Sequence, residues 1–349
     1  MNRRRFLQGL GGTVLGLSLG SVPNSLLYAA DREKGAAILK GMLIIDPHAQ
    51  PDMDSYDRNP TPTSYRFMKE IGMAACCYSA LGDGNAMGRN SYEYAMHELK
   101  YWFDTVVRKG YVKKILKSSD IPEPGSTVPG AIFGLEGGDA LSGNVSRVDE
   151  FYRLGVRIIT VIHYHNNEIG DIMAPLTGGA AGPYKGGLTV TGKAIIERMQ
   201  KLGMVVDVAH SSADTLRDIV AMTQKPLIDS HTGLCGKGLN CGRRRTWQEM
   251  EMVAGTGGVV CSWPDGWGPQ RIRTFSDWAN ELLWMKKRLG IEHVGIGTDG
   301  GGLPNQLQGY KDWRDLVFLA EAMSDAGLSH DDIAAIMGQN VHRVMSECF

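Results

Sequence analysis

The stretches Arg157-Ile-Ile-Thr-Val-Ile-His163 and Met204-Val-Val-Asp-Val-Ala-His210 say most about the fold. Both are mostly apolar, and both end in a histidine. Such runs are typical of strands buried on both faces, as in a parallel sheet. Six similar runs lie between Met42 and Asp299, namely Met42–Asp46, Met73–Ser79, Ala131–Glu136, Pro226–His231, Gly258–Ser262 and His293–Asp299.

Amphipathic segments with helical spacing alternate with these runs, which predicts a parallel sheet with helices outside it. Eight strands favour a closed barrel over an open doubly wound sheet, and no GxGxxG motif follows the first strand to support a dinucleotide-binding domain. We therefore predict an α/β protein with a single (β/α)8 TIM barrel over residues 31–349. The predicted helices are Ser91–Ser118, Gly192–Leu202, Ala213–Met222, Thr246–Ala254, Phe275–Leu289, Trp313–Ala326 and Asp331–Gly338, with long loops at 47–64 and 164–188.

The composition limits which kinds of partner molecule this protein is expected to bind. The 349 residues include 37 basic and 38 acidic side chains, so the net charge of −1 gives no reason to expect nucleic acid or an anionic membrane as a partner. The six cysteines show no CxxC pair or zinc-ribbon spacing. Cys235 and Cys241 are candidates for a disulfide after export, whereas Cys76 and Cys77 lie in an apolar run and are expected to be buried thiols.

The N-terminus has the features of an export signal. Met1-Asn-Arg-Arg-Arg-Phe-Leu-Gln8 precedes a glycine-rich apolar stretch to about Leu27, and the small residues Ala29 and Ala30 follow. The arginine pair before Phe-Leu predicts a twin-arginine signal peptide over residues 1–30. The alternative is an uncleaved anchor, but the stretch is short and glycine-rich for a span of about 20 residues. We expect a periplasmic protein that starts near Asp31 and keeps no stable membrane anchor.

Polar residues recur at one end of the predicted strands, at His48, Glu136, His163, His210, His231 and Asp299. The carboxyl ends of barrel strands meet at one rim, where such enzymes keep their active sites. A single histidine at a strand end is more often structural, but six polar residues on six strands favour a metal site. Imidazole and carboxylate groups suit Zn²⁺ and related ions. His165 could also line the cavity, while His293 begins its strand and lies at the opposite end.

Several motifs together resemble one family. They are Gly134-Leu-Glu-Gly-Gly138, Leu154–His163 followed by Asn166-Asn167, Leu202–Ser211, Pro226–His231, His293–Asp299 and Ile336-Met-Gly-Gln-Asn-Val-His-Arg-Val344. In this order, from about residue 40 to 346, they are similar to motifs of the membrane (renal) dipeptidases, peptidase family M19. The resemblance implies a zinc metallodipeptidase that acts on a dipeptide or another small molecule, and it is compatible with a homodimer.

The resemblance also implies roles for individual residues. Glu136 would bridge two zinc ions, with His48 on one and His210 and His231 on the other. Asp299 would shuttle a proton, and His163 would polarise the substrate or stabilise the tetrahedral intermediate. Asn167 is expected to contact the substrate. Arg243 would bind the substrate carboxylate, with Arg244 and Arg245 as alternatives, because a guanidinium fork matches a carboxylate; the other reading of this triplet is a solvated basic cluster.

This sequence departs from the family pattern in the first strand. Where the family has His-x-Asp, this chain has His48-Ala-Gln50, and an amide oxygen brings no negative charge to a cation. Asp46 and Asp52 are nearby carboxylates, but neither has the spacing of a substitute ligand. We therefore predict one tightly bound Zn²⁺ at Glu136, His210 and His231, and a weakened second site at His48 and Gln50. The alternative is that this second site prefers an ion other than zinc.

Two further departures lie close to the expected site. Gly300–Gly302 follows Asp299 where the family has Phe-Asp-Gly, and Asp139 replaces a histidine after the Glu-Gly-Gly motif. The expected reaction is attack of a metal-bound hydroxide on the peptide carbonyl, with Asp299 taking and returning the proton. Two alternatives stay open. One is a relative that hydrolyses another small amide, ester or lactam, and the other is a binding homologue without catalysis.

Overall fold

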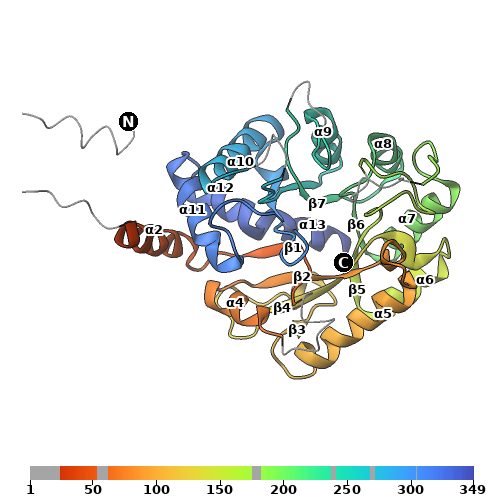
Figure 1. Ribbon diagram of the computed structural model, residues 1–349, viewed down its shortest axis with the longest axis horizontal. Coiled ribbons are helices and arrows are strands. Elements are labelled where there is room, and N and C mark those ends of the chain that lie inside the picture. The colour runs from red at the N-terminus through yellow and green to blue at the C-terminus, as the bar shows by residue number, and fades with distance from the viewer. Residues whose placement is uncertain (1–23, 53–61, 175–181, 237–240, 268–271, 304) are drawn as a thin grey trace, which may run out of the picture.

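Eight parallel strands form a nearly closed barrel that is surrounded by helices (Figure 1). The computed structural model describes residues 24–52, 62–174, 182–236, 241–267, 272–303 and 305–349. The barrel strands are joined in chain order, and their residues are buried because both faces of each strand are covered. They are β1 Ile45–Ala49, β2 Ala75–Leu81, β4 Gly130–Glu136, β5 Val156–Thr160, β6 Val205–Asp207, β7 Ile228–Thr232, β8 Val259–Ser262 and β9 Val294–Ile296. The (β/α)8 prediction is therefore confirmed.

The helices that cover the barrel are capped at positions visible in the sequence. Thr246 and Thr274, for example, each form a capping box with an acidic residue three positions later. The longer helices are α2 Asn24–Leu39, α4 Ser64–Ile71, α5 Ser91–Trp102, α6 Ser146–Leu154, α7 Val190–Leu202, α8 Ala213–Met222, α9 Trp247–Gly255, α10 Phe275–Leu289, α11 Leu316–Asp325 and α13 Asn340–Cys348. Shorter helical segments are η1 Gly84–Met87, η2 Phe103–Val107, η3 Ser118–Asp120, η4 Gly138–Leu141, η5 Ile291–His293, η6 Trp313–Asp315, α12 His330–Ala334 and η7 Ala335–Gln339.

Some predicted boundaries were wrong. The helix predicted over Ser91–Ser118 ends at Val107, and Gly110 then turns the chain in the left-handed conformation with a φ of 72°. The chain continues into β3 Lys113–Lys114, which pairs in parallel with the first two residues of β4. The first strand begins at Ile45 rather than Met42. The short amphipathic helices α4 and α6 were not predicted.

The core lies in two layers, one inside the barrel and one between strands and helices. Ile132 belongs to the inner cluster, and Glu136 lies on the same face of β4 because side chains alternate along a strand. Val341, Val344 and Met345 of α13 complete the inner cluster. The apolar interior thus fills the barrel below the rim on which the polar strand ends lie.

The prediction of buried thiols at Cys76 and Cys77 is confirmed, and the possible disulfide between Cys235 and Cys241 is present. Cys76 and Cys77 are buried free thiols in β2, and Cys235 forms a disulfide with Cys241, with Cα atoms 5.1 Å apart. Residues 1–23 of the predicted signal peptide lie outside the described residues. Among the helices described, none is long and apolar enough to cross a membrane.

The barrel closes through a seam between the ends of β1 and β9. The backbone N–H of Asp299 donates to the carbonyl of His48 at 3.0 Å, and that of Gln50 donates to Gly300 at 2.8 Å. The buried Asp46 carboxylate also accepts bonds from the backbone and hydroxyl of Thr298, at 3.1 and 2.5 Å, and from the indole of Trp313 at 2.8 Å. The Asp46 carboxylate is therefore engaged in hydrogen bonds within the seam, and the seam brings the ends of β1 and β9 together.

Candidate metal centre and active-site cavity

Glu136 lies at the centre of the polar residues that were predicted at the rim. Its Oε1 is 3.1 Å from Nε2 of His48, 3.5 Å from Nε2 of both His163 and His231, and 3.7 Å from Nε2 of His210. These five side chains are buried and come from the ends of five different strands or the loops directly after them. The structure thus brings together the residues that the sequence placed at one rim.

The donor atoms fit a metal ion. Two groups, His48–Glu136–His231 and Glu136–His163–His210, have their ligand atoms within 4.8 Å of one another. Nε2 of His210 and Nε2 of His231 lie only 2.7 Å apart. Burial, with the nearby cation Arg243, holds the pKa of His210 well below its usual value, and burial beside His48 does the same for His231. Neutral imidazoles are the form that binds metals.

Hydrogen bonds behind His231 orient its ring. Nδ1 of His231 is 2.8 Å from the Ser230 hydroxyl, which donates to the carboxylate of Asp207 at 2.6 Å. Asp207 is fully buried and also accepts the backbone N–H of Ser230 and the hydroxyl of Thr160. Partners of this kind fix which ring nitrogen of a histidine faces a metal.

Asp83 holds His163 in an analogous way. One Asp83 oxygen lies 3.2 Å from Nδ1 of His163, and the other accepts the backbone N–H of Tyr164 at 2.7 Å. Burial raises the pKa of Asp83, and the neighbouring His163 opposes this shift. Asp83 was not predicted from the sequence, although it lies two residues after β2, at the same rim as the other site residues.

Gln50 occupies the corner where the family pattern has a metal-binding aspartate. Its amide nitrogen donates to Oε2 of Glu136, while its Oε1 is buried and has no hydrogen-bond partner among the described residues. Burial lowers the pKa of neighbouring His48, but the carboxylates of Glu136 and Asp299 outweigh it and raise that pKa to about 9. Asp52, the other nearby carboxylate, instead accepts backbone N–H groups at the start of α4.

Asp299 faces this corner from the other side of the seam. Its Oδ1 is 3.8 Å from Nε2 of His48, and burial together with the charge of Glu136 raises its pKa to about 7. Asp299 and His210 have left-handed φ angles of 48° and 66°, which is costly for residues other than glycine and common at functional sites. A Cβ on Gly302 would lie 2.4 Å from Oδ1 of Asp299, so glycine leaves room for this carboxylate.

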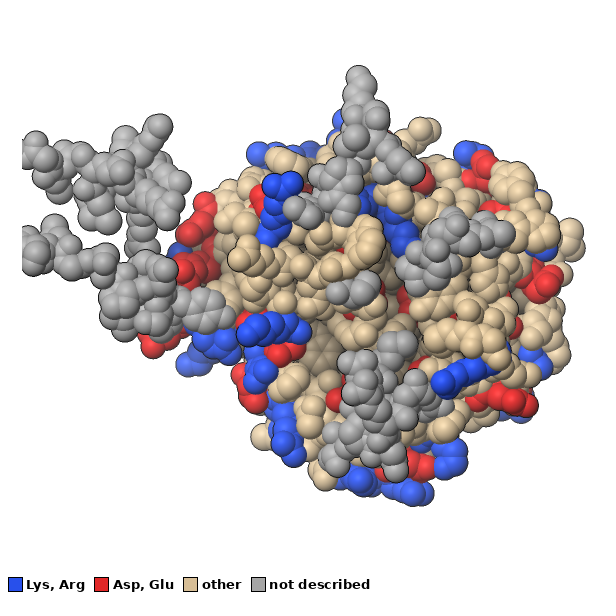
Figure 2. Space-filling model, in the orientation of Figure 1, with Lys and Arg blue, Asp and Glu red and all other residues tan. Residues whose placement is uncertain are grey.

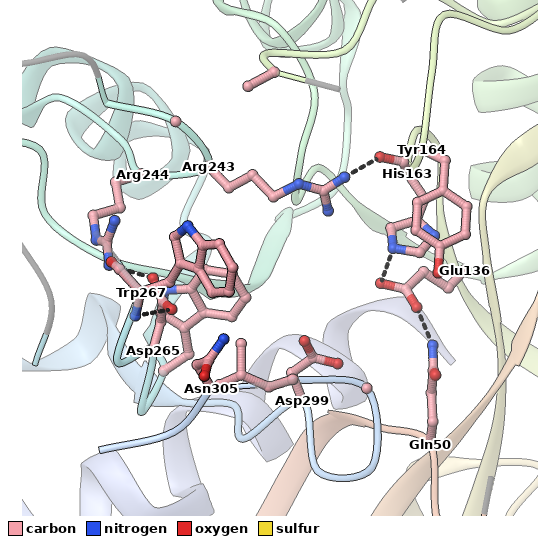
Figure 3. A pocket seen from close by; sticks show the side chains of 15 residues that line it. Gln50, Glu136, His163, Tyr164, Arg243, Arg244, Asp265, Trp267, Asp299 and Asn305 are labelled. Carbon is pink, nitrogen blue, oxygen red and sulfur yellow. Dashed lines mark hydrogen bonds and ion pairs between the residues drawn. The ribbon is translucent and has the colours of Figure 1, made fainter. Parts of the chain in front are cut away.

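The three consecutive arginines have different surroundings. Arg245 is fully buried and bonds to Asp229 and to the carbonyls of Val208 and Ser211, so it is structural. Arg244 forms a buried ion pair with Asp265. Arg243 extends across the cavity, where its guanidinium donates to the carbonyl of His163 at 2.8 Å, while its buried Nε has no partner in the part of the chain described (Figure 3).

These residues surround a cavity of about 510 Å³ at the barrel rim (Figure 3). Charged side chains lie mainly toward the periphery of the face in Figure 2, and its middle is formed mostly by other residues. The apolar residues of the lining were not predicted from the sequence. They lie in the loops after β5, β8 and β9. The cavity is lined by Gln50, Glu136, His163, Tyr164, Ala174, Gly242, Arg243, Arg244, Trp263, Asp265, Trp267, Asp299, Gly302, Leu303 and Asn305.

Asn167 and His165 do not line this cavity. The amide of Asn167 donates to the carbonyl of Val161 and to Asp139, and its oxygen accepts the backbone N–H of Ile169 at 2.8 Å. Asp139 also lies 2.8 Å from Nε2 of His165. These side chains therefore stabilise the loop after β5, and the predicted contact of Asn167 with the substrate stays a prediction.

Comparison with known proteins agrees with this geometry. The sequence matches the model of the membrane dipeptidase family, peptidase family M19, over residues 33–348. It is 29% identical over 223 residues to "Dipeptidase aclJ" of Aspergillus oryzae, covering 62% of this chain and 51% of that protein. "Dipeptidase verJ" of Clonostachys rogersoniana is 30% identical over 220 residues, covering 62% and 54%. The chain thus spans about half the length of these curated relatives.

A solved structure shows the same fold. The metallo peptidase from Rhodobacter sphaeroides, liganded with a phosphinate mimic of the dipeptide L-Ala-D-Ala, superimposes with a TM-score of 0.77 at 16% identity. The match covers 89% of this chain and all of that one. The family match over residues 33–348 shows that the protein belongs to the membrane dipeptidase family, peptidase family M19.

Proposed function

We propose that this protein is a metal-dependent dipeptidase with its reaction centre beside Glu136. The observation that carries the proposal is that one cavity is lined both by Glu136 and His163 of the metal-ligand cluster and by Arg243, whose Nε has no partner among the described residues. A dipeptide carries a carboxylate a short distance from its one peptide bond. Arg243 can therefore hold the carboxylate while the peptide carbonyl lies at the cluster.

Glu136, His210 and His231 would hold one cation tightly, and we propose Zn²⁺ for this site. When bound, the ion would act as a Lewis acid toward water and the peptide carbonyl. The corner formed by His48 and Gln50 supplies an amide instead of a second carboxylate. We therefore propose that a second cation binds there only weakly.

The protein's own groups would complete the reaction. Asp299, whose pKa is raised to about 7, would take a proton from the attacking water and return it to the leaving amine. His163 points its Nε2 toward Glu136 and would donate to the oxygen that becomes negative in the transition state. Arg243 would orient the substrate through its carboxylate.

A panel of dipeptides and their C-terminal amides tests this proposal. The purified mature protein, supplied with zinc, cobalt or manganese, should hydrolyse free dipeptides better than the amides. Arg243→Ala should abolish most of this preference, whereas Arg243→Lys should retain part of it because the charge remains. Absence of hydrolysis with every metal would refute the dipeptidase proposal.

A second candidate is hydrolysis of another small amide, ester or lactam. Gln50 favours it, because this residue changes the part of the cavity beside Glu136. Hydrolysis of such a compound without dependence on Arg243 would support this candidate. A binding homologue without catalysis is excluded if Asp299→Asn reduces turnover strongly while metal content is unchanged.

We also propose that the protein is exported to the periplasm by the twin-arginine route. The Arg3–Phe6 motif and the apolar stretch after it support this proposal. Replacing Arg4 and Arg5 by lysine should leave the unprocessed chain in the cytoplasm. N-terminal sequencing of the periplasmic wild type should find a start near Asp31.

A further inference from the structure

Trp267 is an exposed aromatic residue on the wall of the cavity. Its side chain is 64% exposed, whereas Trp263, deeper on the same wall, is only 5% exposed and lies 5.3 Å from the ring of His231. The two indoles thus line the cavity from the histidine cluster outward. A solvent-exposed tryptophan beside a ligand cavity leaves a large apolar area available for contact with a ligand.

The backbone of Trp267 is fixed on both sides by one buried ion pair. Its N–H donates to Oδ1 of Asp265 at 2.8 Å, and its carbonyl accepts a bond from Arg244 at 2.9 Å. Asp265 and Arg244 are themselves paired and buried. Because both peptide groups are held, the backbone that carries the indole is fixed before any ligand arrives, which lowers the entropy lost on binding.

A second loop braces this wall. The N–H of Gly266 donates to the carbonyl of Asn305 at 2.9 Å, and that of Leu307 donates to Pro264 at 2.9 Å. A Cβ on Gly266 would lie 2.6 Å from the carbonyl oxygen of Gln306, so the loops after β8 and β9 are in close contact. Figure 3 shows Trp267, Arg244, Asp265 and Asn305 across the cavity from Gln50 and Glu136.

The wall is apolar in its net character. Asp265 pairs with Arg244, and both side chains also bond to the backbone of Trp267, so this ion pair adds little net charge to the wall. The large exposed apolar surface on this wall is the indole of Trp267. We infer that Trp267 is a specificity-determining residue that binds a bulky apolar or aromatic side chain of the substrate. This inference rests on the proposed dipeptidase function and names the class of dipeptide that the site prefers.

Matched dipeptides and a matched tryptophan test the inference. The values of kcat/KM are measured for Ala-Ala, Phe-Ala and Ala-Phe with the wild type, Trp267→Ala and Trp284→Ala, all loaded with zinc. Trp284 is 54% exposed on α10 and does not line the cavity, so its variant controls for loss of an exposed indole. Trp267→Phe is included as the conservative variant.

We expect the wild type to prefer one of the phenylalanine dipeptides over Ala-Ala. Trp267→Ala should reduce that preference by roughly tenfold, with kcat/KM for Ala-Ala changed by less than about twofold. Trp267→Phe should restore part of the preference, and Trp284→Ala should behave as the wild type. Phe-Ala and Ala-Phe are then compared, and the one whose kcat/KM falls more in Trp267→Ala shows which substrate residue lies against Trp267.

Two failures are distinguishable. If no dipeptide is hydrolysed by the wild type, the proposed function is refuted and this inference falls with it. If dipeptides are hydrolysed but Trp267→Ala lowers kcat/KM equally for all three, or changes none, only the inference is overturned. Equal metal content and equal Tm of the variants exclude misfolding as the cause of a selective loss.

Discussion

Asp83 binds His163 from behind, with one carboxylate oxygen 3.2 Å from Nδ1 and the other bonded to the backbone N–H of Tyr164. The contact keeps Nε2 of His163 directed toward Glu136, at 3.5 Å from Oε1. Asp83 is therefore a positioning residue for the histidine that we propose acts on the substrate.

Asp83→Asn should lower kcat by roughly 10- to 100-fold, because an amide whose oxygen keeps the bond to Tyr164 turns its N–H group toward Nδ1 of His163, and the ring then loses the acceptor that orients it. KM should change little, and metal content should not change. Steady-state kinetics with elemental analysis measure these effects. Asp139→Asn is the control, since Asp139 bonds to His165 outside the cavity and its variant should keep kcat near that of the wild type. A lost metal ion in Asp83→Asn would contradict a pure positioning role.

Gln50→Asp should raise the number of bound zinc ions from one to two per chain. The new carboxylate would lie beside His48 and Glu136 and would supply the negative charge that this corner lacks. Elemental analysis of wild type, Gln50→Asp and Gln50→Ala measures the stoichiometry. Two ions in the wild type, or one in Gln50→Asp, would show that Gln50 does not determine it.

Ser230→Ala should weaken zinc binding by roughly 10- to 100-fold, because the hydroxyl connects His231 to Asp207. Competition with a fluorescent chelator measures this affinity directly, without reference to catalysis. The matched control is Ser211→Ala. Its hydroxyl is buried beside His210 and makes no hydrogen bond to any described residue, so its loss should leave the affinity nearly unchanged.

The pair formed by His165 and Asp139 should make stability depend on pH. The hydrogen bond to Asp139 raises the pKa of His165 above its usual 6.5. A raised pKa in the folded state means that the stabilising effect is complete below pH 6.5 and is lost as the pH rises through the folded-state pKa. His165→Asn should therefore lower the free energy of unfolding more at pH 5.5 than at pH 8.5. Urea titrations of both proteins at both pH values measure the difference, and equal losses would contradict the prediction.

The sequence predicted the rim residues well because two simple signals coincide there. Glu136, His210 and His231 each stand at the end of a buried apolar run, and parallel strands of a barrel end at one rim. Asp83 and Trp267 lie in the loops beyond β2 and β8 and not within the apolar runs themselves. Their positions depend on hydrogen bonds between loops, which have no periodicity in the sequence. The substrate contact expected of Asn167 came from its position in a family motif, and the motif could not show that its amide also bonds within the loop.

The seam between β1 and β9 also has a consequence for how the protein is made. Asp46 and Thr298, which bond across it, are 252 positions apart in the chain. Until β9 has been synthesised, the nascent chain lacks Asp299, and the end of β1 has no partner. Contacts of such high sequence separation form slowly and late. The corner formed by His48 and Asp299 is therefore completed only after nearly the whole chain has been synthesised, so truncated chains carry the histidines of the candidate metal centre without Asp299, the proton carrier that we propose.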